Sequence, residues 1–84
     1  MSARWLTADT LVKLVKRIRE RWRDAEVLRI VQKRGKQILY VRVGGGVVKL
    51  IVHRDGRVRA FGKPEGLAIA LRTIAERVLG VGEH

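Results

Sequence analysis

Hydrophobic and polar residues alternate with period two between Gln37 and Phe61, and this alternation predicts three successive β-strands. One set of alternate positions is wholly apolar: Leu39, Val41, Val43, Val48, Leu50, Val52, Val58 and Ala60. The complementary set combines cations, rings and aliphatic side chains: Ile38, Tyr40, Arg42, Lys49, Ile51, His53, Arg57, Arg59 and Phe61. A solvated sheet face normally carries charges of both signs, yet this set has no carboxylate. We therefore expect the apolar set to face the core and the mixed set to form a functional surface.

Glycines mark the ends of the expected strands. We predict strands over about residues 27–32, 37–43, 47–53 and 57–61, joined by turns at Gly35, at 44–46 and at Asp55-Gly56. The first strand is partly apolar on both faces, so its register stays open. The three consecutive glycines indicate a hairpin loop, because a phosphate-cradling loop would be followed by a helix.

Two segments with helical periodicity flank the strands. The first covers about residues 8–23, with a start signal at Thr7 and Asp9 and with Leu6 placed to pack on Leu11. The second begins with Pro64 as its first helical residue and ends at Gly80. The predicted fold is a single α+β domain over residues 1–84 with the order α-β-β-β-β-α. Its four-stranded antiparallel meander carries both helices on one face, with residues 1–6 as lead-in and 81–84 as a frayed tail.

The net charge of the chain is +11, from 19 lysines and arginines and 8 carboxylates. Residues 1–63 contribute +12 (17 basic, 5 acidic) and residues 64–84 contribute −1 (2 basic, 3 acidic), so the first helix and the sheet carry the excess. Positive charges at this density repel one another, and an anionic partner, most commonly nucleic acid, would offset that repulsion. A membrane surface fits less well, because the sheet needs the apolar stripe of the first helix. No apolar run reaches signal-peptide or membrane length, so we expect a soluble, cytoplasmic protein. Cysteine is absent, which excludes disulfides and thiolate metal sites but gives no information on the redox compartment.

Catalysis and metal binding find little support in these residues. Nucleophilic catalysis needs convergent groups, and the chain has no cysteine and only Ser2 near its start. His53 beside Asp55 could act as a base with its orienting group, but a histidine at a strand end is more often structural or a nucleic-acid contact. His84 stands in the tail, and no ligand spacing exists. We therefore predict no enzyme activity, no cofactor and no metal.

The mixed face suits unpaired bases, which stack on rings while cations hold the phosphates. Our candidate nucleic-acid-binding residues are Trp5, Arg29, Lys33, Arg34, Lys36, Tyr40, Arg42, Lys49, His53, Arg57, Arg59 and Phe61. Alternatives stay open for several positions. The first helix's cations are either a solvated surface or phosphate contacts, Trp22 is favoured as core, and Trp5 is either a lid or a stacking ring. Ile38, Tyr40, Ile51 and Phe61 could instead be buried against another copy of the sheet.

Duplex DNA fits less well than single strands, because the helices lack residues that typically read base edges and asparagine is absent. In size, element order, basicity and the face formed by Tyr40, Arg42, Lys49, Arg57, Arg59 and Phe61, the chain resembles the archaeal ThermoDBP-related proteins over about residues 7–79. The resemblance implies single-stranded DNA binding by a homo-oligomer, a dimer or tetramer. RNA binding and a scaffold role for the same face are the alternatives.

Overall fold

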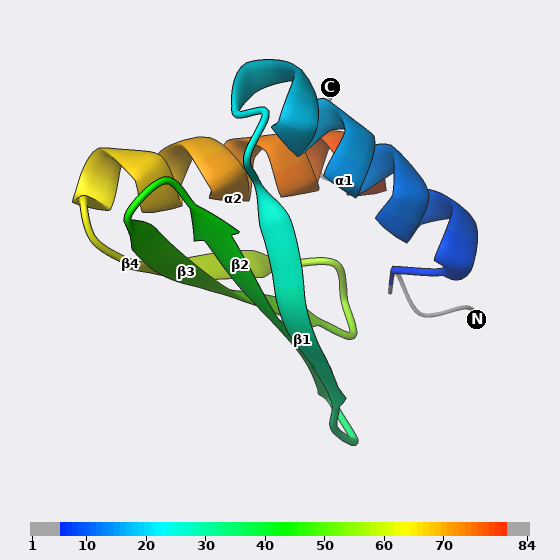
Figure 1. The fold of residues 1–84 in the computed structure, drawn as a ribbon. Helices are drawn as coiled ribbons and strands as arrows, with labels where there is room; N and C mark the ends of the chain where they lie inside the picture. The colour runs from blue at the N-terminus through cyan, green and yellow to red at the C-terminus, as the bar shows by residue number, and fades with distance from the viewer. Residues whose placement is uncertain (1–5, 81–84) are drawn as a thin grey trace.

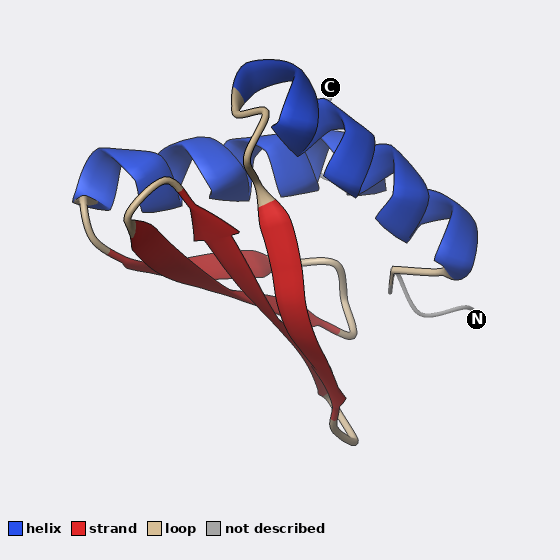
Figure 2. Ribbon diagram, viewed as in Figure 1, coloured by secondary structure: helices blue, strands red, loops and turns tan. Residues whose placement is uncertain are grey.

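The protein is a helix, a four-stranded antiparallel sheet and a second helix, which confirms the predicted fold class. The computed structural model describes residues 6–80. The elements are α1 (Ala8–Arg21), β1 (Glu26–Gln32), β2 (Lys36–Val43), β3 (Gly46–His53), β4 (Val58–Gly62) and α2 (Glu65–Leu79). The strand order is β1-β2-β3-β4, so every strand pairs with its chain neighbour. Figure 1 shows both helices on the same side of the sheet, and Figure 2 separates the helical layer from the strand layer.

Core side chains come from the apolar set that the alternation predicts. Leu39, Leu50 and Val52 have no exposed surface, and Val41 and Val48 are at most 1% exposed. The helices complete the core with Leu14 and Ile18 from α1 and with Ala68, Leu71 and Ala75 from α2. Burying each of the larger side chains contributes roughly 1.5 to 3 kcal/mol, so one face of the sheet is fixed in the core.

Both helices begin or end a little differently from the expectation. Trp22 adopts an extended backbone (φ −130°, ψ 101°), so α1 ends at Arg21 rather than near residue 23. Thr7 caps α1, and its partner in a reciprocal cap is Thr10, whose hydroxyl accepts from the Thr7 N–H at 2.6 Å. Pro64 is the N-cap of α2 and not its first helical residue. Gly80 ends α2 in the left-handed conformation with φ 77°, as predicted.

The segment before α1 is attached to the sheet by one buried amide. The Leu6 N–H donates to Oε1 of Gln37 at 2.8 Å, and Nε2 of Gln37 donates to the Leu6 carbonyl at 3.1 Å. Gln37 is the only buried polar side chain among residues 6–80, and these bonds satisfy it. The pair places Leu6 in the core cluster.

A bulge in β1 resolves the register that the sequence left open. Val27 pairs with Val41 and Arg29 pairs with Tyr40, so Leu28 is the extra residue between them. Leu28 and Ile30 are 47% and 46% exposed at this edge of the sheet. The bulge changes which β1 side chains share a face, and it aligns Arg29 with Tyr40.

The glycines between β2 and β3 form a hairpin turn, as predicted, but they serve different purposes. Gly44 has φ 58°, a backbone conformation that favours glycine. Gly46 belongs to β3, and a Cβ atom there would lie 2.6 Å from the Lys63 carbonyl oxygen. The link from β4 to α2 therefore passes directly over Gly46.

No helix in residues 6–80 is long and apolar enough to cross a membrane.

Candidate nucleic-acid interface

The sheet face opposite the helices carries the predicted functional side chains in four cross-strand rows. Antiparallel register sets these rows: side chains of paired residues lie next to each other, about 4.5–5.5 Å apart at Cβ. From the hairpin tips inward, the rows are Lys36–His53–Arg57, Val31–Ile38–Ile51–Arg59, Arg29–Tyr40–Lys49–Phe61 and Glu26–Arg42–Val47. We call this surface the open face. The two predicted rings thus belong to the same row.

In that third row, cations and rings alternate across all four strands. Tyr40 pairs with Arg29 on one side and with Lys49 on the other, and Lys49 in turn pairs with Phe61. Strands are about 4.8 Å apart, so the two rings are separated by roughly 10 Å with the Lys49 ammonium stem between them. In this order Lys49 lies between the two rings, and Arg29 lies beyond Tyr40 at one end of the row.

The rings differ in exposure. Phe61 is 48% exposed, while Tyr40 is half-buried. The guanidinium carbon of Arg59 lies 5.5 Å from the centre of the Phe61 ring, within cation–π range. Arg59 therefore covers part of the ring in the free protein. A base stacking on Phe61 would displace that guanidinium or be held beside it.

Two hairpin tips meet at one end of the open face. The Arg54 N–H donates to the Gly35 carbonyl at 3.0 Å, which ties the β3–β4 turn to the β1–β2 turn. Lys33 and Arg34 lie in the β1–β2 turn, and both are exposed. The structure therefore brings the tip cations next to the Lys36–His53–Arg57 row, as a phosphate-binding end would require.

Two of the candidate cations have carboxylate partners. Arg42 forms an ion pair with Glu26, and Arg57 Nε lies 2.8 Å from Oδ2 of Asp55. The backbone N–H of Arg57 also donates to Asp55 at 3.0 Å; this bond, with the guanidinium charge, keeps the pKa of Asp55 below its usual range. Both pairs are exposed and contribute little to stability. No other ion pair occurs among residues 6–80, so Arg29, Lys36, Lys49 and Arg59 have no carboxylate partner within that range.

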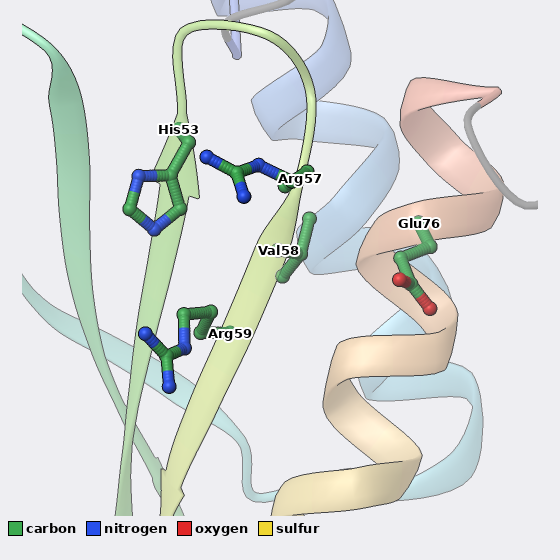
Figure 3. A pocket seen from close by; sticks show the side chains of 5 residues that line it. All are labelled: His53, Arg57, Val58, Arg59 and Glu76. Carbon is green, nitrogen blue, oxygen red and sulfur yellow. The ribbon is translucent and has the colours of Figure 1, made fainter.

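A hollow of about 510 Å³ borders the open face where β4 meets α2. It is lined by His53, Arg57, Val58, Arg59 and Glu76. Figure 3 shows the side chains of His53, Arg57 and Arg59 on the side of β3 and β4 away from α2, with Glu76 on α2 beyond β4. The hollow is wide open, and within residues 6–80 no group of three metal-ligating side chains occurs. The hollow therefore extends the basic surface of the open face to its edge at β4.

Two expectations for single residues need correction, one is confirmed and one lies outside the described residues. Ile38 is only 6% exposed within a single chain, whereas its burial against another copy of the sheet would require it to be exposed. Arg42 belongs to the face, but Glu26, which lies in β1 and not before it as predicted, partly neutralises it. Trp22 is half-buried and packs against the core, as favoured. Trp5 lies outside the described residues.

Sequence reasoning also missed how the helix cations divide. On one flank of α1, Arg19 Nε donates to the Ala25 carbonyl at 3.0 Å, a structural role. On the other flank, Arg17 and Arg21 share a hollow with Arg77 of α2. Arg77 lies 60 positions from Arg17 along the chain, and only the packing of the two helices brings them together.

Comparison of the chain with protein-family models, with curated proteins and with solved structures finds no match in any of the three.

Proposed function

We propose that the protein binds single-stranded nucleic acid on the open face, by stacking bases on Tyr40 and Phe61 while the surrounding cations hold the backbone. The observation that carries the proposal is the Arg29–Tyr40–Lys49–Phe61 row, in which cations alternate with rings across the sheet. Each stacked base contributes roughly 1 to 3 kcal/mol to the binding free energy. This contribution depends little on which base is stacked, because every base has a flat aromatic face. Binding is therefore expected to be tolerant of sequence.

Single strands fit this face better than a duplex does. Rings that lie within a sheet can stack only on bases whose faces are free, and those of paired bases are covered by their neighbours. The preference for DNA over RNA rests on the resemblance to ThermoDBP-related proteins alone, and RNA is the alternative ligand.

A second candidate function is a scaffold subunit that uses the open face as a protein interface. The exposure of Phe61 (48%) and Val47 (46%) on that face supports it. The row of cations argues against it as the sole role, because two copies of a positively charged face repel each other.

The test is a titration of single-stranded DNA, RNA and duplex DNA by fluorescence anisotropy at several salt concentrations. Neutralising a phosphate in a single strand gives a slope of about −0.7 in log affinity against log salt. Contacts from Arg29, Lys36, Lys49 and Arg59, with Lys33 and Arg34 at the hairpin tip, thus predict a slope of about −4. An affinity for single strands that does not change with salt, or tighter duplex binding at every concentration, would contradict the proposal.

A further inference from the structure

The outer surface of the helical layer contains a second cationic groove, between α1 and α2. Its volume is about 260 Å³, and it is lined by Arg17, Glu20, Arg21, Ile74 and Arg77. Figure 1 shows the two helices next to each other above the sheet. The core-facing positions Leu14, Ile18, Leu71 and Ala75 point to the sheet, so the groove, on other sides of both helices, opens away from the open face.

Charge in the groove is unbalanced. Three guanidiniums face one carboxylate, which gives a net charge of +2 within a small hollow. Glu20 is not within ion-pair distance of any of the three, and no carboxylate elsewhere in residues 6–80 is. Arg17 and Arg21 are one helical turn apart, about 5.4 Å along the axis, while Arg77 approaches from α2. Such an arrangement of bidentate donors fits an anion with several oxygens, such as a phosphate.

A second, separate hollow shares one lining residue, Arg21, with the groove, and it contains a ring. Arg21 also lines a space of about 420 Å³ that includes Trp22 and Gly44. The guanidinium carbon of Arg21 lies 4.8 Å from the centre of the Trp22 ring, which holds the arginine against the indole. A chain of phosphates in the groove would thus lead to a partly exposed aromatic surface. Free phosphate has no flat group that could stack on that surface, whereas a nucleotide has its base.

We propose that this groove binds a second segment of single-stranded nucleic acid, so that one protein chain holds two strands on opposite sides. The inference rests on the proposed function of the open face and adds a separate site to it. The occupant is chosen by charge complementarity and by the ring next to the arginines. The thickness of the domain then sets the distance between the two strands.

The experiment counts oligonucleotides per protein chain by native mass spectrometry. The probe is an oligothymidylate of about four nucleotides, at the low end of the footprint of small single-strand-binding domains, so that one oligonucleotide fills one site. The wild-type chain should carry two. A groove variant, R17Q/R21Q/R77Q, should carry one, and an open-face variant, Y40A/F61A, should also carry one.

A matched control separates the groove from net charge. The variant K13Q/K16Q/R72Q removes three cations from exposed helix positions that do not line the groove, and it should still carry two oligonucleotides. Circular dichroism confirms folding of each variant; the three groove arginines are exposed, so their replacement leaves the core intact.

The two proposals fail in different ways. A groove variant that still carries two oligonucleotides, or a wild-type chain that carries only one at the open face, overturns the second site and leaves the first. An open-face variant that binds like the wild type overturns the proposed function of that face, whatever the groove does. A wild-type chain that binds none contradicts both.

Discussion

Phe61 and Tyr40 are the residues on which the stacking hypothesis depends, and each is placed for it in a different way. Phe61 is at the edge strand and is the more exposed of the two. Tyr40 is on β2 between Arg29 and Lys49, and its hydroxyl gives it a polar end that Phe61 lacks. We therefore expect Phe61 to provide the accessible stacking surface and Tyr40 to add orientation.

Replacing either ring should weaken binding without changing its dependence on salt. Tyr40→Ala and Phe61→Ala should each reduce the binding free energy by roughly 1 to 3 kcal/mol, because stacking is lost while the phosphate contacts remain. Arg59→Ala should instead make the salt slope shallower by about one contact. Anisotropy titrations at several salt concentrations separate these two effects.

Val47→Ala is the control for this pair, because Val47 is about as exposed as Phe61 on the open face but belongs to the Glu26–Arg42–Val47 row, which has no ring. It should bind like the wild type. Folded Tyr40 and Phe61 variants with unchanged affinity would remove stacking from the mechanism.

At the residue scale, the sequence predicted which side chains share a face but not what each one meets there. Ile38 has the right parity for the open face, yet it is only 6% exposed at its position between Val31 and Ile51 in the cross-strand row. The pairing of Arg42 with Glu26 depends on the register after the β1 bulge. Parity is a local property, whereas burial and ion pairing depend on register, which a period-two pattern does not determine.

The link between β4 and α2 is the element whose path depends most on glycine. Gly46 is approached by the Lys63 carbonyl, and a Cβ on Gly62 would lie 2.8 Å from the Val47 carbonyl oxygen. Two elements are thus packed backbone to backbone where the chain leaves the sheet.

Gly46→Ala should destabilise the fold by about 1 to 3 kcal/mol, because the methyl group would clash with a backbone carbonyl that has no rotamer in which to move aside. Urea unfolding followed by circular dichroism measures the change. Gly45→Ala is the matched control one residue earlier, with nothing within 4 Å of the new Cβ and no left-handed φ. It should change the free energy of unfolding by less than about 0.5 kcal/mol. Equal effects of the two substitutions would show that the turn, and not the contact with Lys63, sets the need for glycine.

At the element scale, the strands with clear alternation were predicted closely, and the predicted topology is confirmed. The first strand was ambiguous for a physical reason: the bulge at Leu28 interrupts its period, so no single alternation describes it. The helix groove could not be predicted at all. Arg17 and Arg77 have ordinary exposed helix positions in the sequence, and the crossing of α1 and α2 that brings them together is a tertiary property.

For the whole molecule, we predict self-association through the open face in the absence of nucleic acid. Phe61 and Val47 remain exposed there, and Tyr40 and Ile51 are only half-buried. The burial of Ile38 within one chain makes the apolar area smaller than the sequence suggested, and the cations of two open faces repel each other. The expected association is therefore weak and becomes stronger at higher salt. Because the proposed base stacking and the expected self-association use the same surface, adding a short single strand should dissociate the oligomer.

Sedimentation velocity over a range of protein concentrations measures both effects. Phe61→Lys keeps the backbone and adds charge to the face, and it should shift the protein to monomer. A wild-type protein that remains monomeric at high concentration would contradict the prediction, and an oligomer that persists with bound single strands would place the interface elsewhere.

The order of the strands has a consequence for how the chain reaches this structure. Each strand pairs with its neighbour in sequence, so the sheet can form from three short-range hairpins with little loss of loop entropy. The contact between α1 and α2, by contrast, joins the two ends of the chain. A sheet formed before the helices dock exposes its whole apolar face, which is a state prone to aggregation. The net charge of +11 then keeps newly synthesised chains apart by mutual repulsion during that interval, so the same cations that suit an anionic ligand also protect folding.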